Sequence, residues 1–179
     1  MLFRSQIVPG SARAKQALLD LGDELMESDD RVHAMVYWSN ALGAFDLESQ
    51  ADRKFGAEEQ QALNRLIAFF KQQQDWRSLS RHLQLQAKIE TDTDKKIAIL
   101  QSCAEVYEEQ LNDQIEAINI HETIFLLNPE SAPSLPALKR LYEESEHWHG
   151  LSRLLAKAAR ETVDPKKQAQ LWLEKVAVD

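Results

Sequence analysis

The sequence contains little cysteine, glycine or proline: one Cys, five Gly and five Pro among 179 residues. The single cysteine, Cys103, excludes an internal disulfide and fits a reducing compartment, and we expect it to be a buried core thiol. Glycine and proline punctuate turns. Their scarcity, together with 44% hydrophobic residues, therefore predicts a folded, helix-rich chain that is long enough to bury a core.

Long apolar runs are also missing. The longest uncharged stretch with apolar character, residues 33–45, is shorter than the roughly 20 residues that a membrane-spanning helix needs. No basic leader with an apolar run and a cleavage site opens the chain, so we expect a cytoplasmic protein without a membrane span. The first five residues fit no periodic pattern and match the translation of a sequencing adapter. We interpret them as an artefact of gene assembly within an N-terminal tail over residues 1–14, and we expect the natural protein to continue beyond the last residue.

Positive charge is scarce, since 21 Lys and Arg residues face 29 Asp and Glu residues, which gives a net charge of −8. A duplex nucleic-acid binder needs a basic face that displaces counterions from phosphates, so this balance argues against one. The acidity is uneven: residues 15–48 hold two basic and eight acidic residues, and residues 97–132 hold seven acidic and no basic ones. The segments 49–96 and 133–179 carry net charges of +2 and +1. Such an acidic surface is either a solvated face or a field that steers a basic partner.

The chain resembles itself at an offset of 72 residues. The matching residues in the earlier segment are Trp76, Leu79, Ser80, Arg81, Leu83, Ala87, Asp92 and Lys95. Their counterparts in the later segment are Trp148, Leu151, Ser152, Arg153, Leu155, Ala159, Asp164 and Lys167. Two repeats of about 36 residues would produce this offset.

Apolar residues recur at helical spacing, and the breaks between them carry helix-capping residues. Capping residues separate two such patterns at three places: residues 28–30, Asp75 and residues 112–113. Each of these places predicts the turn of a helical hairpin. Asp164, followed by proline, opens a ninth helix. No segment alternates like a strand, so we expect an all-α fold without a sheet. The expected core consists of Leu21, Leu25, Trp38, Leu66, Phe70, Leu83, Leu100, Tyr107, Ile124, Leu138, Leu141 and Leu155.

These residues resemble the tetratricopeptide repeat, a helical hairpin of about 34 residues with large and small residues at set positions. The first repeat fills these positions with Leu18, Leu21, Gly22, Leu25, Ala34, Trp38 and Ala41. The third repeat, with one residue inserted in its turn, fills them with Leu100, Ala104, Tyr107, Ala117, His121, Ile124 and Pro129. The second and fourth repeats depart from the pattern, with larger residues where the family has small ones: Ile67, Leu79, Lys139 and Leu151.

The resemblance implies an α-solenoid of about four antiparallel hairpins plus one further helix over residues 15–179. The repeats cover about residues 15–48, 56–92, 93–131 and 132–164, and a further one begins over 165–179. The small residues at Gly22 and Ala104, with Ala34 and Ala117 on the second helices, would let paired helices approach closely. We therefore expect leucine at Gly22 or Ala104 to overpack the hairpin, at a cost of about 1 to 3 kcal/mol.

In the family, the first helices of successive hairpins line a concave groove that binds peptides or proteins. The corresponding positions, which we call the predicted groove residues, are Gln16, Asp23, Asn64, Lys71, Gln101, Glu105, Glu108, Arg140 and Glu143. Some members clamp a ligand's terminal carboxylate with Lys and Asn, but this chain has Leu19 and Asp23 there, so that ligand class is not expected. The acidic groove residues favour a basic partner.

Catalytic and metal-binding patterns are missing from the sequence. His147 and His149 would point to different faces of a helix, and no Cys or carboxylate repeat supports a metal site. His121 has Phe125 four residues later, so the zinc-protease pair is incomplete, and we interpret His121 as replacing a core aromatic residue. We expect core packing, rather than a stacking platform, for the tryptophans Trp38, Trp76, Trp148 and Trp172. The expectation is a protein that is not an enzyme and uses no cofactor and no metal.

The leading functional hypothesis is a non-catalytic protein–protein interaction scaffold that binds a peptide or protein in its groove. One alternative is a structural spacer or oligomerisation segment of a larger bacterial-type protein, in which the solenoid face self-associates. The other is the helical accessory region of a larger enzyme, whose catalytic domain is absent from this sequence.

Overall fold

The computed structural model describes residues 10–43, 54–129 and 134–179. Within these ranges every regular element is a helix and no residue lies in a strand, which confirms the all-α prediction. The chain divides into two compact units, Met1–Ile89 and Glu90–Asp179, which we call unit 1 and unit 2. The first five residues of the predicted tail, and Glu130 of the acidic segment, lie outside the described residues.

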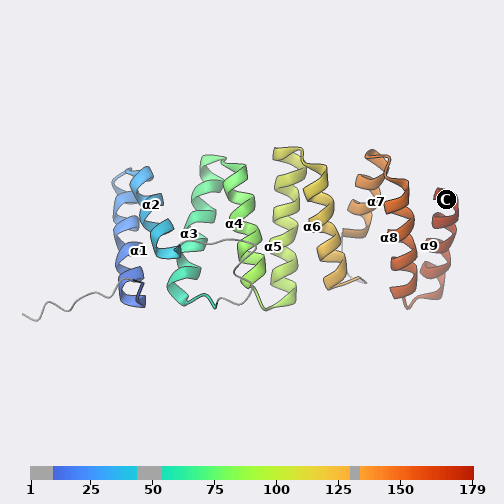
Figure 1. The fold of residues 1–179 in the computed structure, drawn as a ribbon, viewed down its shortest axis with the longest axis horizontal. Helices are drawn as coiled ribbons and strands as arrows, with labels where there is room; N and C mark the ends of the chain where they lie inside the picture. Colours follow the sequence, from blue (N-terminus) through green and yellow to red (C-terminus); the bar gives the residue numbers. More distant parts are fainter. Residues whose placement is uncertain (1–9, 44–53, 130–133) are drawn as a thin grey trace, which may run out of the picture. The chain divides into compact units, whose positions relative to one another are not determined.

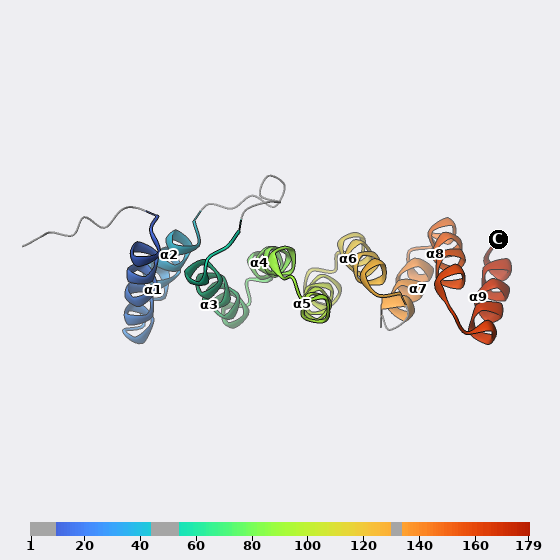
Figure 2. The same ribbon diagram turned by 90° about the horizontal axis from the view of Figure 1, so that it is seen from below.

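Unit 1 contains two helical hairpins (Figure 1), formed by α1 (Ala12–Glu27), α2 (Arg31–Leu42), α3 (Ala57–Gln73) and α4 (Trp76–Ile89). The side chain of Ser11 caps α1, so residues 12–14, which we had assigned to the tail, are helical. Each helix packs on the next, and α1 also packs on α3. Figure 2 shows α1 and α3 in one row of unit 1 and α2 and α4 in the other.

Unit 2 contains α5 (Thr93–Glu105), η1 (Val106–Leu111), α6 (Gln114–Leu127), α7 (Ser134–Glu144), α8 (Trp148–Glu161) and α9 (Pro165–Val178). The element η1 is a π-helical continuation of α5. Consecutive helices pack on one another from α5 through α9. In Figure 2, α5, α7 and α9 form one row of this unit and α6 and α8 form the other, so each unit has a layer of first helices and a layer of second helices.

The same turn joins the two helices of all four described hairpins. Each turn contains one residue with a positive φ angle, and these residues are Asp29, Gln74, Asn112 and Glu146. The amide of the following residue donates to a carbonyl in the last turn of the first helix, over 2.8 to 3.0 Å. This arrangement is a Schellman-type end, which satisfies carbonyls that the helix itself leaves unpaired. Side chains at Asp30, Asp75, Asp113 and Asp164 cap the next helices, as predicted.

The internal match at 72 residues is visible in the local structure. Helices α4 and α8 both have 14 residues, and both begin at the matching tryptophans, Trp76 and Trp148. The positive-φ residues before them, Gln74 and Glu146, are also 72 positions apart. Equivalent sequence therefore gives equivalent turns and helices in the two units.

The residue inserted in the third repeat lies in the helix and not, as expected, in the turn. In three of the turns the donated amide bonds to the carbonyl five residues earlier, but the amide of Asp113 bonds to that of Tyr107, six residues earlier. The π-helical segment η1 absorbs the extra residue by widening the last helical turn. Such π-helical segments are frequent at functional sites.

Nine of the twelve predicted core residues are buried, and Leu21, Leu25 and Tyr107 are not. Leu21 is 44% exposed because the buried face of α1 runs through Leu19 and Gly22, one helix position away from the predicted series. Leu25 and Tyr107 are only partly buried, since both lie near the ends of first helices, where the turns begin.

The prediction of core packing for the tryptophans holds only for Trp38, which is 5% exposed. Trp76 is partly buried. Trp148 is 49% exposed because it is the first residue of α8, and Trp172 is 37% exposed on α9, which has no buried residue. For these last two residues the prediction was wrong. Cys103 is buried as expected, and burial raises the pKa of its thiol to about 12.

The close approach predicted at the small positions is present in the first hairpin. A Cβ added to Gly22 would lie 2.5 Å from Nε1 of Trp38 and 3.2 Å from the carbonyl oxygen of Ala34. The small residues of the third repeat, Ala104 and Ala117, are 1% and 0% exposed. The close approach is therefore present in the first hairpin, and the small residues of the third repeat lie in the core of unit 2.

The buried His82 should make unit 1 less stable at acid pH. Burial lowers the pKa of His82 below its ordinary value of 6.5, despite the hydrogen bond that Nδ1 donates to the Ser78 carbonyl at 2.7 Å. The unfolded chain therefore takes up a proton below pH 6.5 that the folded chain resists, so this contribution is complete above the unfolded pKa and is lost as the pH falls. The urea concentration at the unfolding midpoint should fall from about pH 7.5 to about pH 5.5, and it should fall less for His82→Phe than for the parent. An unchanged dependence in His82→Phe would contradict the assignment.

Candidate functional site

All nine predicted groove residues lie on the first helices of hairpins, as their repeat register implies. Gln16 and Asp23 are on α1 and Asn64 and Lys71 are on α3 of unit 1. In unit 2, α5 carries Gln101 and Glu105, η1 carries Glu108, and α7 carries Arg140 and Glu143. The structure joins one pair of them, Glu108 and Arg140, in a salt bridge.

Asp23 is held by two neighbouring helices of unit 1. Its Oδ1 accepts the indole N–H of Trp38 on α2 at 3.0 Å and the Nε–H of Arg65 on α3 at 2.7 Å. Its Oδ2 accepts a second guanidinium hydrogen bond, also at 2.7 Å. This two-pronged pair raises the pKa of Arg65 and fixes three helices through one carboxylate. Asp23 is therefore engaged within the chain.

Glu108 makes the corresponding contacts in unit 2. Its Oε1 accepts from Nε2 of His121 on α6 at 2.8 Å, and its Oε2 forms an ion pair with Arg140 on α7. The side chain of Glu108 is 18% exposed and that of His121 is 10% exposed. Burial by itself would raise the pKa of Glu108, but the hydrogen bonds from Arg140 and His121 outweigh it and lower this pKa. Glu108 is therefore ionised at neutral pH.

We call these two arrangements carboxylate clamps. Each joins an acid on a first helix, a ring N–H on the second helix and an arginine on the next first helix. Trp38 and His121 are both the eighth residue of their helices, so they occupy the same register position. His121 is 8% exposed, so it lies in the core, as predicted. The sequence predicted Arg140 as a groove residue and His121 as a core residue, but it did not single out Arg65, whose only signal is a basic residue on the next first helix.

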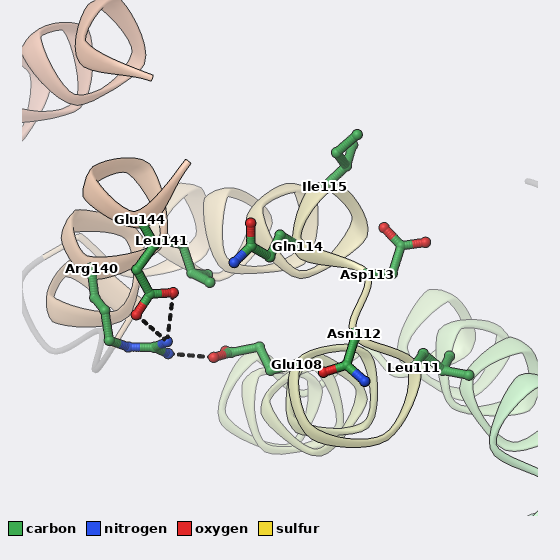
Figure 3. Close-up of a pocket in the computed structure, with 9 residues that line it drawn as sticks. All are labelled: Glu108, Leu111, Asn112, Asp113, Gln114, Ile115, Arg140, Leu141 and Glu144. Atoms are coloured by element: carbon green, nitrogen blue, oxygen red, sulfur yellow. Dashed lines mark hydrogen bonds and ion pairs between the residues drawn. The ribbon is translucent and has the colours of Figure 1, made fainter. Parts of the chain in front are cut away.

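A cleft of about 600 Å³ lies beside the clamp of unit 2. Its walls come from η1, the turn after it, the start of α6 and α7 (Figure 3), and they consist of Glu108, Leu111, Asn112, Asp113, Gln114, Ile115, Arg140, Leu141 and Glu144. Figure 3 shows Arg140 extending from α7 toward Glu108, with Glu144 beside it. Two predicted groove residues, Glu108 and Arg140, thus share one hollow with polar walls.

The other predicted groove residues do not line this cleft. Gln16 donates to Asp20 at 2.8 Å, and Asn64 accepts from Gln86 at 2.9 Å, so both have partners within unit 1. The side chains of Lys71, Glu105 and Glu143 are exposed, and that of Gln101 is partly buried.

The two histidines that flank Trp148 have different surroundings. His147 lies at the start of α8, and its ring stacks on that of Tyr142 with the ring centroids 5.6 Å apart. His149 is exposed. Among the described residues, no group of three or more His, Cys, Asp or Glu side chains could hold a metal ion. Within the same ranges, none of the helices combines the length and apolar character needed to cross a membrane.

No protein-family model and no curated protein sequence matches the chain. The described residues define an all-helical protein of antiparallel hairpins in which neighbouring helices pack on one another.

Proposed function

We propose that the chain is a helical repeat scaffold of the tetratricopeptide type that binds a peptide or protein and performs no catalysis. The observation that carries this proposal is the cleft beside Glu108 and Arg140, because these two of its nine wall residues lie at predicted groove positions on first helices. The repeated Schellman turn and the two helix layers within each unit support the repeat assignment.

The charge of the cleft favours a basic partner. Glu108, Asp113 and Glu144 face a single arginine in its walls, and that arginine already pairs with the two glutamates. The exposed Glu105 and Glu109 add negative charge on the same helical segment. A field of one sign in a concave site attracts oppositely charged ligands and raises their association rate. Lysine-rich or arginine-rich peptide segments fit this surface best.

Fluorescence anisotropy with short lysine-rich, glutamate-rich and neutral peptides tests the proposal. The lysine-rich peptide should bind most tightly, and its affinity should fall between about 50 and 300 mM salt as the field is screened. Glu144→Lys changes an exposed cleft residue and should weaken this binding roughly three- to tenfold, mainly through slower association.

The matched control is Glu161→Lys, which makes the same charge change at an exposed position of α8 away from the cleft. It should leave the affinity for the lysine-rich peptide close to that of the parent. If all three peptides bind equally, or if the two variants weaken binding equally, the cleft is not the binding site.

A further inference from the structure

A second hollow, of about 300 Å³, lies between α6 and α8 in unit 2. These two second helices are neighbours in one layer, but each packs on α7 and not on the other (Figure 2). The walls of the hollow consist of Glu122 and Leu126 from α6 and of Gly150, Arg153, Leu154 and Lys157 from α8. None of these six residues lines the cleft beside Glu108, so the hollow is a separate surface. We call it the α6–α8 hollow.

Part of the α6–α8 hollow is apolar. Leu126 on α6 is 62% exposed, and Leu154 on α8 is 5% exposed. An aliphatic side chain that enters between these leucines is stabilised, because the surfaces that meet lose their water. Pockets for small molecules have volumes of about 300–1,000 Å³, so this hollow is at the lower end of the range. It therefore accommodates a few side chains and not a large cofactor.

The charged part of the hollow is mainly positive. Arg153 is exposed, and Nζ of Lys157 lies 5.7 Å from the ring centroid of Phe125, which favours this position of the ammonium group. Neither Arg153 nor Lys157 forms an ion pair with a described residue, in contrast to the arginines of the two clamps. The acid in the wall, Glu122, accepts the hydroxyl hydrogen of Tyr142 at 2.7 Å. The hollow therefore presents two cations beside a carboxylate that already has a partner.

Positive charge continues along α8 beyond the hollow. The exposed Arg160 follows Arg153 and Lys157 at the spacing i, i+4, i+7, which places the three side chains on one face of the helix. Three positive charges along about two helical turns complement an extended ligand with several carboxylates better than a single small anion. A bilayer surface would have to enter the concave hollow to reach Leu154. The shape and charge therefore favour a peptide.

We propose that the α6–α8 hollow binds an acidic peptide segment in which one aliphatic side chain is flanked by aspartates or glutamates. The aliphatic side chain lies against Leu126 and Leu154, and the flanking carboxylates pair with Arg153, Lys157 and Arg160. This site selects the opposite charge from the cleft beside Glu108 and uses different residues, so it does not rest on the proposed function. With both sites occupied, one chain holds a basic and an acidic segment at the same time.

Fluorescence anisotropy of the full chain with two labelled acidic peptides tests the proposal. One peptide of about ten residues carries a central leucine between aspartates and glutamates, and the other has serine in its place. The parent should bind the leucine peptide at least about tenfold more tightly than the serine peptide, because only leucine fills the apolar part of the hollow. The affinity for both peptides should fall between about 50 and 300 mM salt.

Two variants separate the apolar contact from the charged one. Leu126→Ser should weaken binding of the leucine peptide at least about fivefold and leave binding of the serine peptide unchanged. Arg153→Glu should weaken binding of both peptides about tenfold. The matched controls Val32→Ser and Arg13→Glu make the same changes at exposed positions of α2 and α1, and both should bind like the parent. Circular dichroism of all four variants should match the parent, because each replaced side chain is exposed.

Glu144→Lys, which alters the cleft beside Glu108, should leave the affinity for the leucine peptide close to that of the parent. Failure of this site and failure of the proposed function are therefore distinguishable. A parent that binds neither peptide, or binds both equally, would overturn the proposal, as would losses that the controls share. A parent that sediments with vesicles of equal parts phosphatidylcholine and phosphatidylserine but does not bind the leucine peptide would assign the surface to lipid headgroups and also overturn it.

Discussion

Replacing Glu108 with lysine should lower the free energy of unfolding by about 2–4 kcal/mol, because it breaks the carboxylate clamp of unit 2. The change removes the acceptor of His121 Nε2 and places an ammonium group beside the guanidinium of Arg140. Nδ1 of His121 has no partner in the structure, so the buried ring would lose its one hydrogen bond. Leaving a buried polar group unsatisfied adds to the cost of the lost ion pair.

Glu105→Lys is the matched control for this prediction. It makes the same substitution three residues earlier, at an exposed position that forms no ion pair with a described residue, and should change stability by no more than about 0.5 kcal/mol. Urea denaturation followed by circular dichroism gives both values. Equal midpoints for Glu108→Lys and Glu105→Lys would show that the clamp does not stabilise the fold. The contrast also matters for binding assays, since only the Glu105 variant should keep the stability of the parent.

The hairpins could be predicted from the sequence because local signals specify them. Aspartates at the starts of helices, a proline after Asp164 and apolar residues at helical spacing act within a few residues, and the structure places caps at these positions. The equivalence of Trp38 and His121 was also visible, since it follows from the repeat register. Local chemistry and the repeat register therefore located the helices and all of the clamp residues except Arg65.

The clamps themselves could not be predicted, because they depend on contacts between distant residues. Arg65 pairs with an acid 42 residues away, and Arg140 with one 32 residues away. The π-helical segment shifts the register of α5 at the point where Glu108 lies, and no sequence signal places that extra residue in the helix. The series through Leu21 failed for a related reason. Two adjacent faces of α1 both carry leucines, and only tertiary packing selects the one through Leu19.

Replacing Gly22 with alanine should have opposite effects in two backgrounds. In the parent, the new Cβ would lie 2.5 Å from Nε1 and 2.6 Å from Cδ1 of Trp38. The ring cannot retreat freely, because it donates to Asp23 and makes an edge contact with Phe69 at 6.1 Å. We therefore expect a loss of about 1–3 kcal/mol from overpacking.

With Trp38 replaced by alanine, the atoms that crowd the new Cβ are gone except for the Ala34 carbonyl oxygen at 3.2 Å. Trp38→Ala should itself cost about 3–5 kcal/mol. In that background Gly22→Ala should stabilise the chain by up to about 1 kcal/mol, because alanine is the better residue in a helix interior. Urea denaturation of the four proteins gives the coupling energy, expected to be at least about 1 kcal/mol. The same cost for Gly22→Ala in both backgrounds would mean that the glycine is not needed for the close packing of α1 against Trp38.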